Sequence, residues 1–350
     1  MGRVRRRDAW LVAVALAAAG CSDALEQTSS SGQVIAVVNS NHTVSFVAAA
    51  DLSVRTVDLQ AGGAAITAAG RGSTVLVPLG SADSVAVINN AGLCTTGLCV
   101  RPVVVLPLAR GSGATGVVIQ DDSIAWVANP KLNTVTRLNF LSGDTASFHV
   151  GVYPQALAFV RGRVFVANGN VVNGAPAGPS WLSSIPCCGG PSVDSIPLSG
   201  ANARFLTVGD DSLLYVVNSG YPMRGDGKLS VVDPASRTEL VVINGLGEAP
   251  GAAAFHPSGR VLISSISDGI LEVNTLTRSV TRGPGQGLKP GGDGVTGLAI
   301  DQGGRVYALD AGACTSPGVV HVLSAPPDYD ELRAVAVGVC PSATALAVVP

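Results

Sequence analysis

The sequence has few charged side chains, few aromatic side chains and almost no methionine. Asp, Glu, Lys and Arg make up 13% of the 350 residues and aromatic residues 4%, with two Met and three Lys. Beyond residue 20 there is no run of basic residues, whereas contacts to nucleic acid phosphates need a clustered basic face. The sequence therefore argues against a nucleic acid partner.

The composition also excludes a disordered chain and a chain built on long helices. Hydrophobic residues make up 47% of the sequence, which is too apolar for disorder. The 43 Gly and 21 Pro interrupt it too often for long helices. An all-β domain fits this composition, and such domains often exceed the average domain length.

The N-terminal segment predicts export. Arg3, Arg5, Arg6 and Arg7 precede an apolar run at 9–19, which is too short to span a bilayer and is typical of a signal peptide. The run ends in Ala-Ala-Gly-Cys, which resembles the site cut by lipoprotein signal peptidase and implies a lipid on Cys21. The alternative is an ordinary signal peptide followed by an incidental cysteine.

These features predict three parts. Residues 1–20 are a lipoprotein signal peptide, 21–33 a lipidated cysteine with a polar, Ser-rich tether, and 34–350 the folded domain. Without residues 1–20 the chain has 18 basic and 23 acidic residues, a net charge of −5. The predicted location is the cell envelope, at the outer membrane or the periplasmic or extracellular face, with the membrane a partner through the lipid.

A pentad of mostly β-branched or aromatic residues recurs seven times, at intervals of 39 to 50 residues. Its copies are IAVVN (35–39), VLVPL (75–79), AWVAN (125–129), VFVAN (164–168), LYVVN (214–218), VLISS (261–265) and VYALD (306–310). An apolar strand and a tight turn precede the pentad, and two further strands follow it. The repeat predicts four antiparallel strands per unit, hence a seven-bladed β-propeller of the all-β class.

The two ends of the domain are complementary. The domain begins with a second strand at 35–39 and finishes with a first strand at 343–350. Pairing these segments would complete one blade from one C-terminal and three N-terminal strands. Such a one-plus-three clasp removes the free sheet edge.

The repeat resembles the YVTN-type propeller repeat. Residues 125–139 carry the resemblance best, together with 214–218 and 229–243; Leu79 and Ser265 depart from it where the pattern has Asn. Propellers of this type occur in surface layers and in the periplasm. Related lactonases and streptogramin lyases share the fold, but a fold alone does not give a function.

Six cysteines follow Cys21, an even number that suits disulfides in an oxidising compartment. Cys94 and Cys99 lie in one long turn, and Cys314 and Cys340 in two loops of the seventh unit. The neighbours Cys187 and Cys188 could bond to one another or elsewhere. Nothing in their spacing or surroundings indicates a metal or a redox site, and no cofactor is predicted.

Four insertions are predicted to share one face of the propeller, at 169–179, 219–227, 282–295 and 311–318. Long loops on one face of a repeat scaffold usually mark the binding face, although drift also tolerates Gly-Pro loops. The candidate ligand-binding residues in or beside them are Tyr153, Tyr221, Arg224, Asp226, Lys289, Asp293 and Asp310.

The asparagines that end four pentads, Asn39, Asn129, Asn168 and Asn218, have two interpretations. A ring of metal or ligand contacts is one; a short side chain that caps its own turn by bonding the backbone two residues on is the other, which we favour. The four histidines share no repeat position, and none has an acidic residue at motif distance.

The sequence thus predicts a lipid-anchored, non-catalytic binding or scaffold protein with a protein or glycan ligand. The alternative is a lactonase-like or lyase-like enzyme at the channel mouth, with His149 near Tyr153, Asp293 and Asp310. A structural role in a surface layer is a third interpretation.

Overall fold

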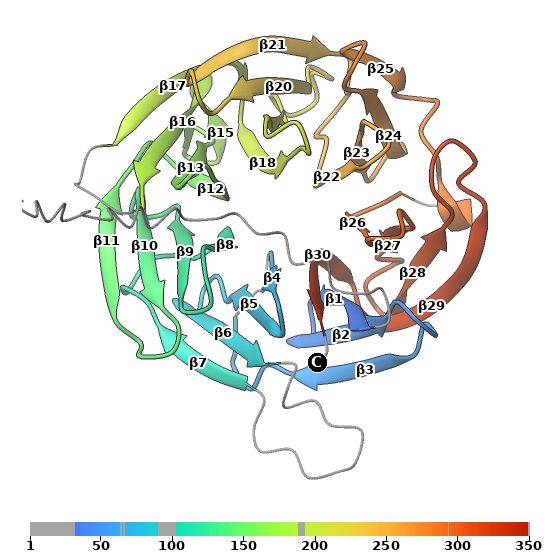
Figure 1. Cartoon of the computed structure of the whole chain (residues 1–350), viewed down its shortest axis with the longest axis horizontal. Coiled ribbons are helices and arrows are strands. Elements are labelled where there is room, and N and C mark those ends of the chain that lie inside the picture. Colours follow the sequence, from blue (N-terminus) through green and yellow to red (C-terminus); the bar gives the residue numbers. More distant parts are fainter. Residues whose placement is uncertain are drawn as a thin grey trace, which may run out of the picture.

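The computed structural model describes residues 32–63, 65, 67–89, 103–187, 193–292 and 294–348. Its strands form seven four-stranded antiparallel sheets, which surround a central channel as the blades of a propeller (Figure 1). The predicted fold is therefore confirmed. Cys21 and the predicted signal peptide lie outside the described residues.

The blades are given from the channel outward. Blade 1 contains β30 (Pro341–Val348), β1 (Gln33–Asn39), β2 (Thr43–Ala48) and β3 (Val54–Asp58). Blade 2 contains β4 (Ala69–Arg71), β5 (Thr74–Pro78), β6 (Ser84–Asn89) and β7 (Val103–Pro107). Blade 3 contains β8 (Val117–Ile119), β9 (Ile124–Asn129), β10 (Thr134–Asn139) and β11 (Thr145–His149). Blade 4 contains β12 (Pro154–Val160), β13 (Arg163–Asn168), β16 (Pro179–Pro186) and β17 (Asp194–Ala201).

The remaining blades follow the same order. Blade 5 contains β18 (Ala203–Val208), β19 (Leu214–Asn218), β20 (Lys228–Asp233) and β21 (Thr238–Asn244). Blade 6 contains β22 (Ala253–His256), β23 (Arg260–Ser265), β24 (Gly269–Asn274) and β25 (Ser279–Arg282). Blade 7 contains β26 (Gly297–Ile300), β27 (Val306–Asp310), β28 (Pro317–Leu323) and β29 (Glu331–Val339).

Two smaller elements lie in the connections between these strands. A hairpin, β14 (Val171–Val172) and β15 (Ala175–Pro176), occupies most of the insertion at 169–179, which the sequence predicted only as a loop. A short 3-10 helix, η3 (Pro290–Gly292), precedes blade 7. Among the described residues, no helix has both the length and the apolar character needed to cross a bilayer.

The recurring pentads form the second strands, and their side chains pack against both neighbouring blades. Because successive side chains of a strand point to opposite faces, Ile35 and Val37 of β1 face blade 7 while Ala36 and Val38 face blade 2. The same alternation gives one apolar cluster at each of the seven blade interfaces. This two-sided burial explains why the pentads are apolar throughout rather than alternating.

The ring closes in blade 1, as predicted. β1 pairs antiparallel with β30, with Ile35 opposite Leu346 and Val37 opposite Thr344. A disulfide between Cys314 and Cys340 joins the loop after β27 to the turn between β29 and β30, which confirms that predicted pair. Cys94, Cys99 and Cys188 lie outside the described residues, so the other predicted disulfides remain predictions.

The first strand of blade 2, β4, is short and covers only Ala69–Arg71. Strand β4 runs so close to β30 that a Cβ on Gly70 would lie 1.7 Å from the carbonyl oxygen of Leu346. Backbones can approach this closely only where a glycine lies at the contact, so the contact sets the position of this strand.

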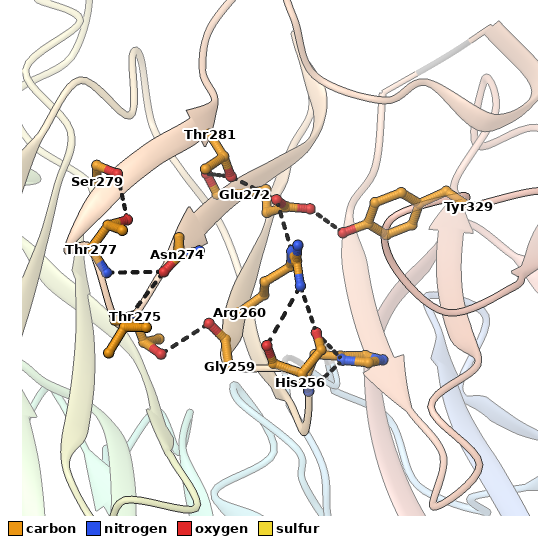
Figure 2. A network of polar contacts seen from close by, with 12 residues as sticks. His256, Gly259, Arg260, Glu272, Asn274, Thr275, Thr277, Ser279, Thr281 and Tyr329 are labelled. Atoms are coloured by element: carbon orange, nitrogen blue, oxygen red, sulfur yellow. Dashed lines mark hydrogen bonds and ion pairs between the residues drawn. The ribbon is translucent and has the colours of Figure 1, made fainter.

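A buried carboxylate connects blades 6 and 7 (Figure 2). Glu272 of β24 is 5% exposed; it accepts hydrogen bonds from Arg260 Nε (3.1 Å) and Thr281 Oγ1 (2.6 Å) and from the hydroxyl of Tyr329, which lies in the β28–β29 connection. Burial raises the pKa of Glu272, but the hydrogen bonds from Thr281 and Tyr329 and the charge of Arg260 outweigh it, so this pKa lies below its usual range. The carboxylate is therefore ionised at neutral pH.

We predict that Glu272→Gln lowers the free energy of unfolding by about 2–3 kcal/mol near neutral pH, because Arg260 loses its charged partner in a buried site. The folded-state pKa of Glu272 is depressed, so its stabilising contribution is complete above the unfolded-state value of about 4.3 and is lost as the pH falls through the folded-state value. Urea unfolding should therefore show a gap between wild type and variant at neutral pH that narrows in acid. Asp328→Asn, at an exposed site next to Tyr329, is the control; an equal effect of the two variants at neutral pH would contradict this role.

We predict that Cys314→Ser with Cys340→Ser lowers the free energy of unfolding by about 3.5 kcal/mol, the chain-entropy value for a loop of this length. The cysteines are 26 residues apart in the sequence. Thermal unfolding with and without reductant measures the effect. Reductant should lower the melting temperature of the wild type more than that of the double variant, because only the wild type has the Cys314–Cys340 bond to lose. A wild-type protein that is insensitive to reductant after complete reduction would refute a stabilising role.

Candidate functional site: the loop-bearing face and the channel mouth

The four predicted insertions lie on one face of the ring. Three of them connect a second strand to a third: β13 to β16, β19 to β20, and β27 to β28. The fourth connects β25 of blade 6 to β26 of blade 7. In an antiparallel blade these two kinds of connection leave from the same end, so they surround the same mouth of the channel.

The loop of blade 5 brings together three of the predicted residues. Asp226 Oδ1 accepts a hydrogen bond from the backbone N–H of Tyr221 (2.9 Å) and thereby closes the loop. The guanidinium carbon of Arg224 lies 4.5 Å from the centre of the Tyr221 ring, in a cation–π contact. Met223 lies between them in sequence and is 88% exposed. The loop thus presents an ordered cationic and apolar surface.

This loop is fastened to the connection that enters blade 6. The backbone N–H of Met223 donates to Glu248 Oε1 (3.0 Å), and the N–H of Gly227 donates to the carbonyl of Gly247 (2.8 Å). Ser219 Oγ also donates to the carbonyl of Pro250 (2.9 Å). The exposed residues of the loop are therefore held at both ends.

Tyr153 orders the neighbouring part of the face through its backbone. Its N–H donates to Asn133 Oδ1 and its carbonyl accepts from the N–H of Gly169, each at 2.9 Å. It adopts a left-handed conformation (φ 58°), which is uncommon for a residue with a large side chain. Tyr153 thus ties the loops of blades 3 and 4 together, while its half-buried side chain remains a candidate contact.

Lys289 and Asp293 were predicted in the connection between blades 6 and 7. Lys289 is exposed and lies directly before η3. Asp293 lies outside the described residues. Lys289 belongs to the connection between blades 6 and 7, whereas Tyr221 and Arg224 belong to the loop of blade 5.

Asp310 lies beside a histidine that the sequence analysis set aside. Its Oδ1 caps the following turn by accepting from the N–H of Gly312 (2.8 Å), and its Oδ2 lies 3.8 Å from Nε2 of His321. Nδ1 of the same ring is 2.7 Å from Glu331. No acidic residue lies at motif distance from His321 in the sequence, but strand pairing places Asp310 and Glu331 next to its ring.

Two residues of the predicted enzyme alternative, His149 and Asp310, lie in different blades, and a third, Asp293, lies outside the described residues. His149 is exposed on β11, the outermost strand of blade 3, whereas Asp310 ends β27 in blade 7. These strands lie on opposite sides of the ring (Figure 1). A single reacting group cannot contact both side chains.

The recurring asparagines are buried between strands rather than exposed at the rim. Their Nδ2 atoms donate mainly to hydroxyls of the third strand, as from Asn218 to Ser230 Oγ (2.8 Å), and not to the turn that follows. A Cβ on Gly200 of the preceding blade would lie 2.2 Å from Cγ of Asn218. The predicted capping of the following turn is therefore wrong for these residues, because the amides pack between strands and against the neighbouring blade.

The channel mouth contains a charged residue that the sequence analysis missed. Arg204, the second residue of β18, is exposed and lines a cavity of about 160 Å³ between the first strands of the blades. The other described lining residues are apolar or carry a hydroxyl group, apart from a glycine. In the other blades described there, the residue at the position equivalent to Arg204 is Thr, Gln, Ser or Gly. This equivalence depends on the strand pairing and carries no signal in the sequence.

Within the part of the chain that the structure describes, no group of three or more His, Cys, Asp or Glu side chains is arranged to hold a metal ion.

No family model and no curated protein matches the chain. Solved structures, in contrast, do match it. Hydrazine synthase of Kuenenia stuttgartiensis superposes with a TM-score of 0.62 at 15% identity, over 80% of this chain and 88% of that one. Virginiamycin B lyase from Staphylococcus aureus gives a TM-score of 0.59 at 13% identity, over 80% of this chain and 92% of the lyase.

AztD from Citrobacter koseri is similar over a larger share of both chains, 90% of this one and 97% of its own, with a TM-score of 0.56 and 14% identity. The similarity is one of fold. At identities this low, none of the activities that these names carry passes to this chain.

Proposed function

We propose that this protein is a non-catalytic binding or scaffold protein of the cell envelope. It is anchored by a lipid on Cys21, is held away from the membrane by a tether that begins at residue 22 and ends where β1 begins at Gln33, and binds a protein through its loop-bearing face. The repeats belong to the YVTN type in this proposal.

The observation that carries the binding role is the ordered surface of the blade 5 loop. Met, Tyr and Arg are enriched at the centres of protein interfaces, and here they are adjacent and accessible. Hydrogen bonds from backbone N–H groups of the loop to Asp226, Glu248 and the carbonyl of Gly247 hold this loop before any ligand arrives. Little conformational entropy is then lost on binding, so more of the contact energy contributes to affinity.

The same surface favours a protein ligand over a glycan. The guanidinium of Arg224 covers one face of the Tyr221 ring. A sugar ring would stack on such an aromatic face, whereas a protein can contact the exposed Met223 side chain and the Arg224 donors directly. A glycan ligand is therefore the alternative outcome of the test.

To test binding, the immobilised full-length chain is incubated with detergent-solubilised envelope proteins of its host, and a bound protein is identified and purified. We predict that Tyr221→Ser with Arg224→Ser weakens its binding at least tenfold. Asp226→Ala should weaken it as well, though less, because it frees the loop without removing either contact residue. Arg333→Gln, on the outer strand β29, should leave the affinity unchanged.

Equal binding by the loop variants and the control would refute the proposed face. Binding only of envelope polysaccharide would replace the protein ligand by a glycan. Association of the chain with itself, lost in the same loop variants, would instead support the scaffold role.

We predict that Cys21→Ala abolishes incorporation of labelled palmitate in a bacterial host and releases the protein from the membrane fraction. Cys187→Ala is the control and should be labelled like the wild type. Labelling that persists in Cys21→Ala would contradict the lipid anchor without bearing on the binding face.

A further inference from the structure

Hydrogen bonds join neighbouring blades near the channel at four of the seven blade interfaces, just inside the loop-bearing face. In each, a polar side chain at or just before the first strand of one blade bonds the corresponding segment of the next. They run from Thr67 Oγ1 to the carbonyl of Thr115, from Thr115 Oγ1 to the carbonyl of Gln155 (3.3 Å), from Gln155 Nε2 to Asn202 Oδ1 (3.0 Å) and from Thr296 Oγ1 to the carbonyl of Pro341 (2.8 Å). We call this set the channel belt.

Arg204 occupies a belt position but takes no part in the belt. The pairing register shifts by one residue at Gln155 in β12 and at Arg204 in β18, so the two residues are equivalent. Gln155 bonds the next blade, whereas the only contact recorded for the Arg204 side chain among the described residues is with the ring of Phe205, 5.4 Å from the guanidinium carbon. Its donors are therefore not used to hold the blades together.

A second belt position also has an unused polar group. Ser342 of β30 precedes Ala343, which pairs with Val38, and thus corresponds to Arg204 in blade 1. Its hydroxyl is buried and has no hydrogen-bond partner in the described structure. Ser342 and Arg204 line the same cavity, from strands on opposite sides of the channel (Figure 1).

The cavity has the character of a site for a small amphiphilic anion. Arg204 is the one charged residue among its described lining residues. Its lining includes the apolar residues Val117, Leu157 and Leu298, which are 5–8% exposed. A further cavity of about 250 Å³ shares Leu298 and two more lining residues with it. Most residues that line this second cavity are apolar, and Asp210 is the one charged residue among those described.

We propose that the channel mouth binds a small carboxylic acid, with the carboxylate on Arg204 and the hydrocarbon body directed down the channel. The planar guanidinium offers two parallel donors that match the two oxygens of a carboxylate. The apolar walls favour a hydrocarbon body over a fully charged ion such as phosphate. This site goes beyond the protein-binding face proposed above, and neither depends on the other.

The test uses the full-length protein and sodium hexanoate as the probe. The Nε–Hε resonance of Arg204, assigned through its loss in Arg204→Gln, is followed by NMR during titration at constant ionic strength. We predict saturable binding in the wild type and at least tenfold weaker binding in Arg204→Gln. The loss in Arg204→Lys should be intermediate, because lysine keeps the positive charge but lacks the two parallel donors of the guanidinium. Arg333→Gln should bind hexanoate like the wild type.

Two measurements on the wild type complete the test. 1-Hexanol, which has the same hydrocarbon body without the charge, should bind at least tenfold more weakly than hexanoate. Added NaCl should weaken the binding of hexanoate but not that of hexanol.

Three results would overturn the proposal. Equal affinity of wild type and Arg204→Gln would remove the role of Arg204. Equal binding of hexanoate, acetate and phosphate would show an unselective anion site and refute the amphiphilic acid. No saturable binding would refute the site altogether. In each case, capture of a partner that still depends on Tyr221 and Arg224 would leave the proposed binding face intact.

Discussion

The pairing of β1 with β30 is the interaction on which the rest of the molecule depends. Each blade packs only against its two neighbours, so an open ring would expose two unpaired blade faces. The hydrogen bonds between Ile35, Val37 and their partners on β30 close the ring in one blade. The disulfide Cys314–Cys340 reinforces the same region from blade 7. The packing of all seven interfaces therefore rests on one continuous circle of contacts.

Two kinds of polar contact fix the orientation of blades that are otherwise held by non-directional apolar packing. At the channel, the belt joins first strands through single hydrogen bonds such as that from Thr296 to Pro341. Farther out, buried polar groups such as Glu272 with Tyr329 join particular blades. Arg204 differs from Gln155, the polar residue at the equivalent position of blade 4. Gln155 bonds the next blade, whereas the Arg204 side chain, within the described part of the chain, does not.

The fold could be predicted for two reasons. Each second strand is buried on both faces, so it appears in the sequence as a repeated apolar pentad. The one-plus-three clasp requires a second strand near the start of the domain and a first strand at its end, and both were visible in the sequence. The Cys314–Cys340 pair followed from the faces on which the loops emerge. The surroundings of His321 and Arg204 could not be predicted in the same way. The neighbours of His321 depend on the register of three strands, and the position of Arg204 depends on a shift of one residue in pairing. Neither register leaves a motif in the sequence.

The clasp also has a consequence for how the chain folds. Ser40 contacts Val339 across a sequence separation of 299 residues, so β1 meets its partner only after nearly the whole domain has been made. Until then one edge of the first blade exposes unpaired backbone groups and the apolar side chains of Ile35 and Val37. Contacts so distant in sequence slow folding, and exposed edges invite pairing with other chains. The pairing of β1 with β30 closes the finished ring, but during synthesis the first blade stays incomplete until the last strand has been made.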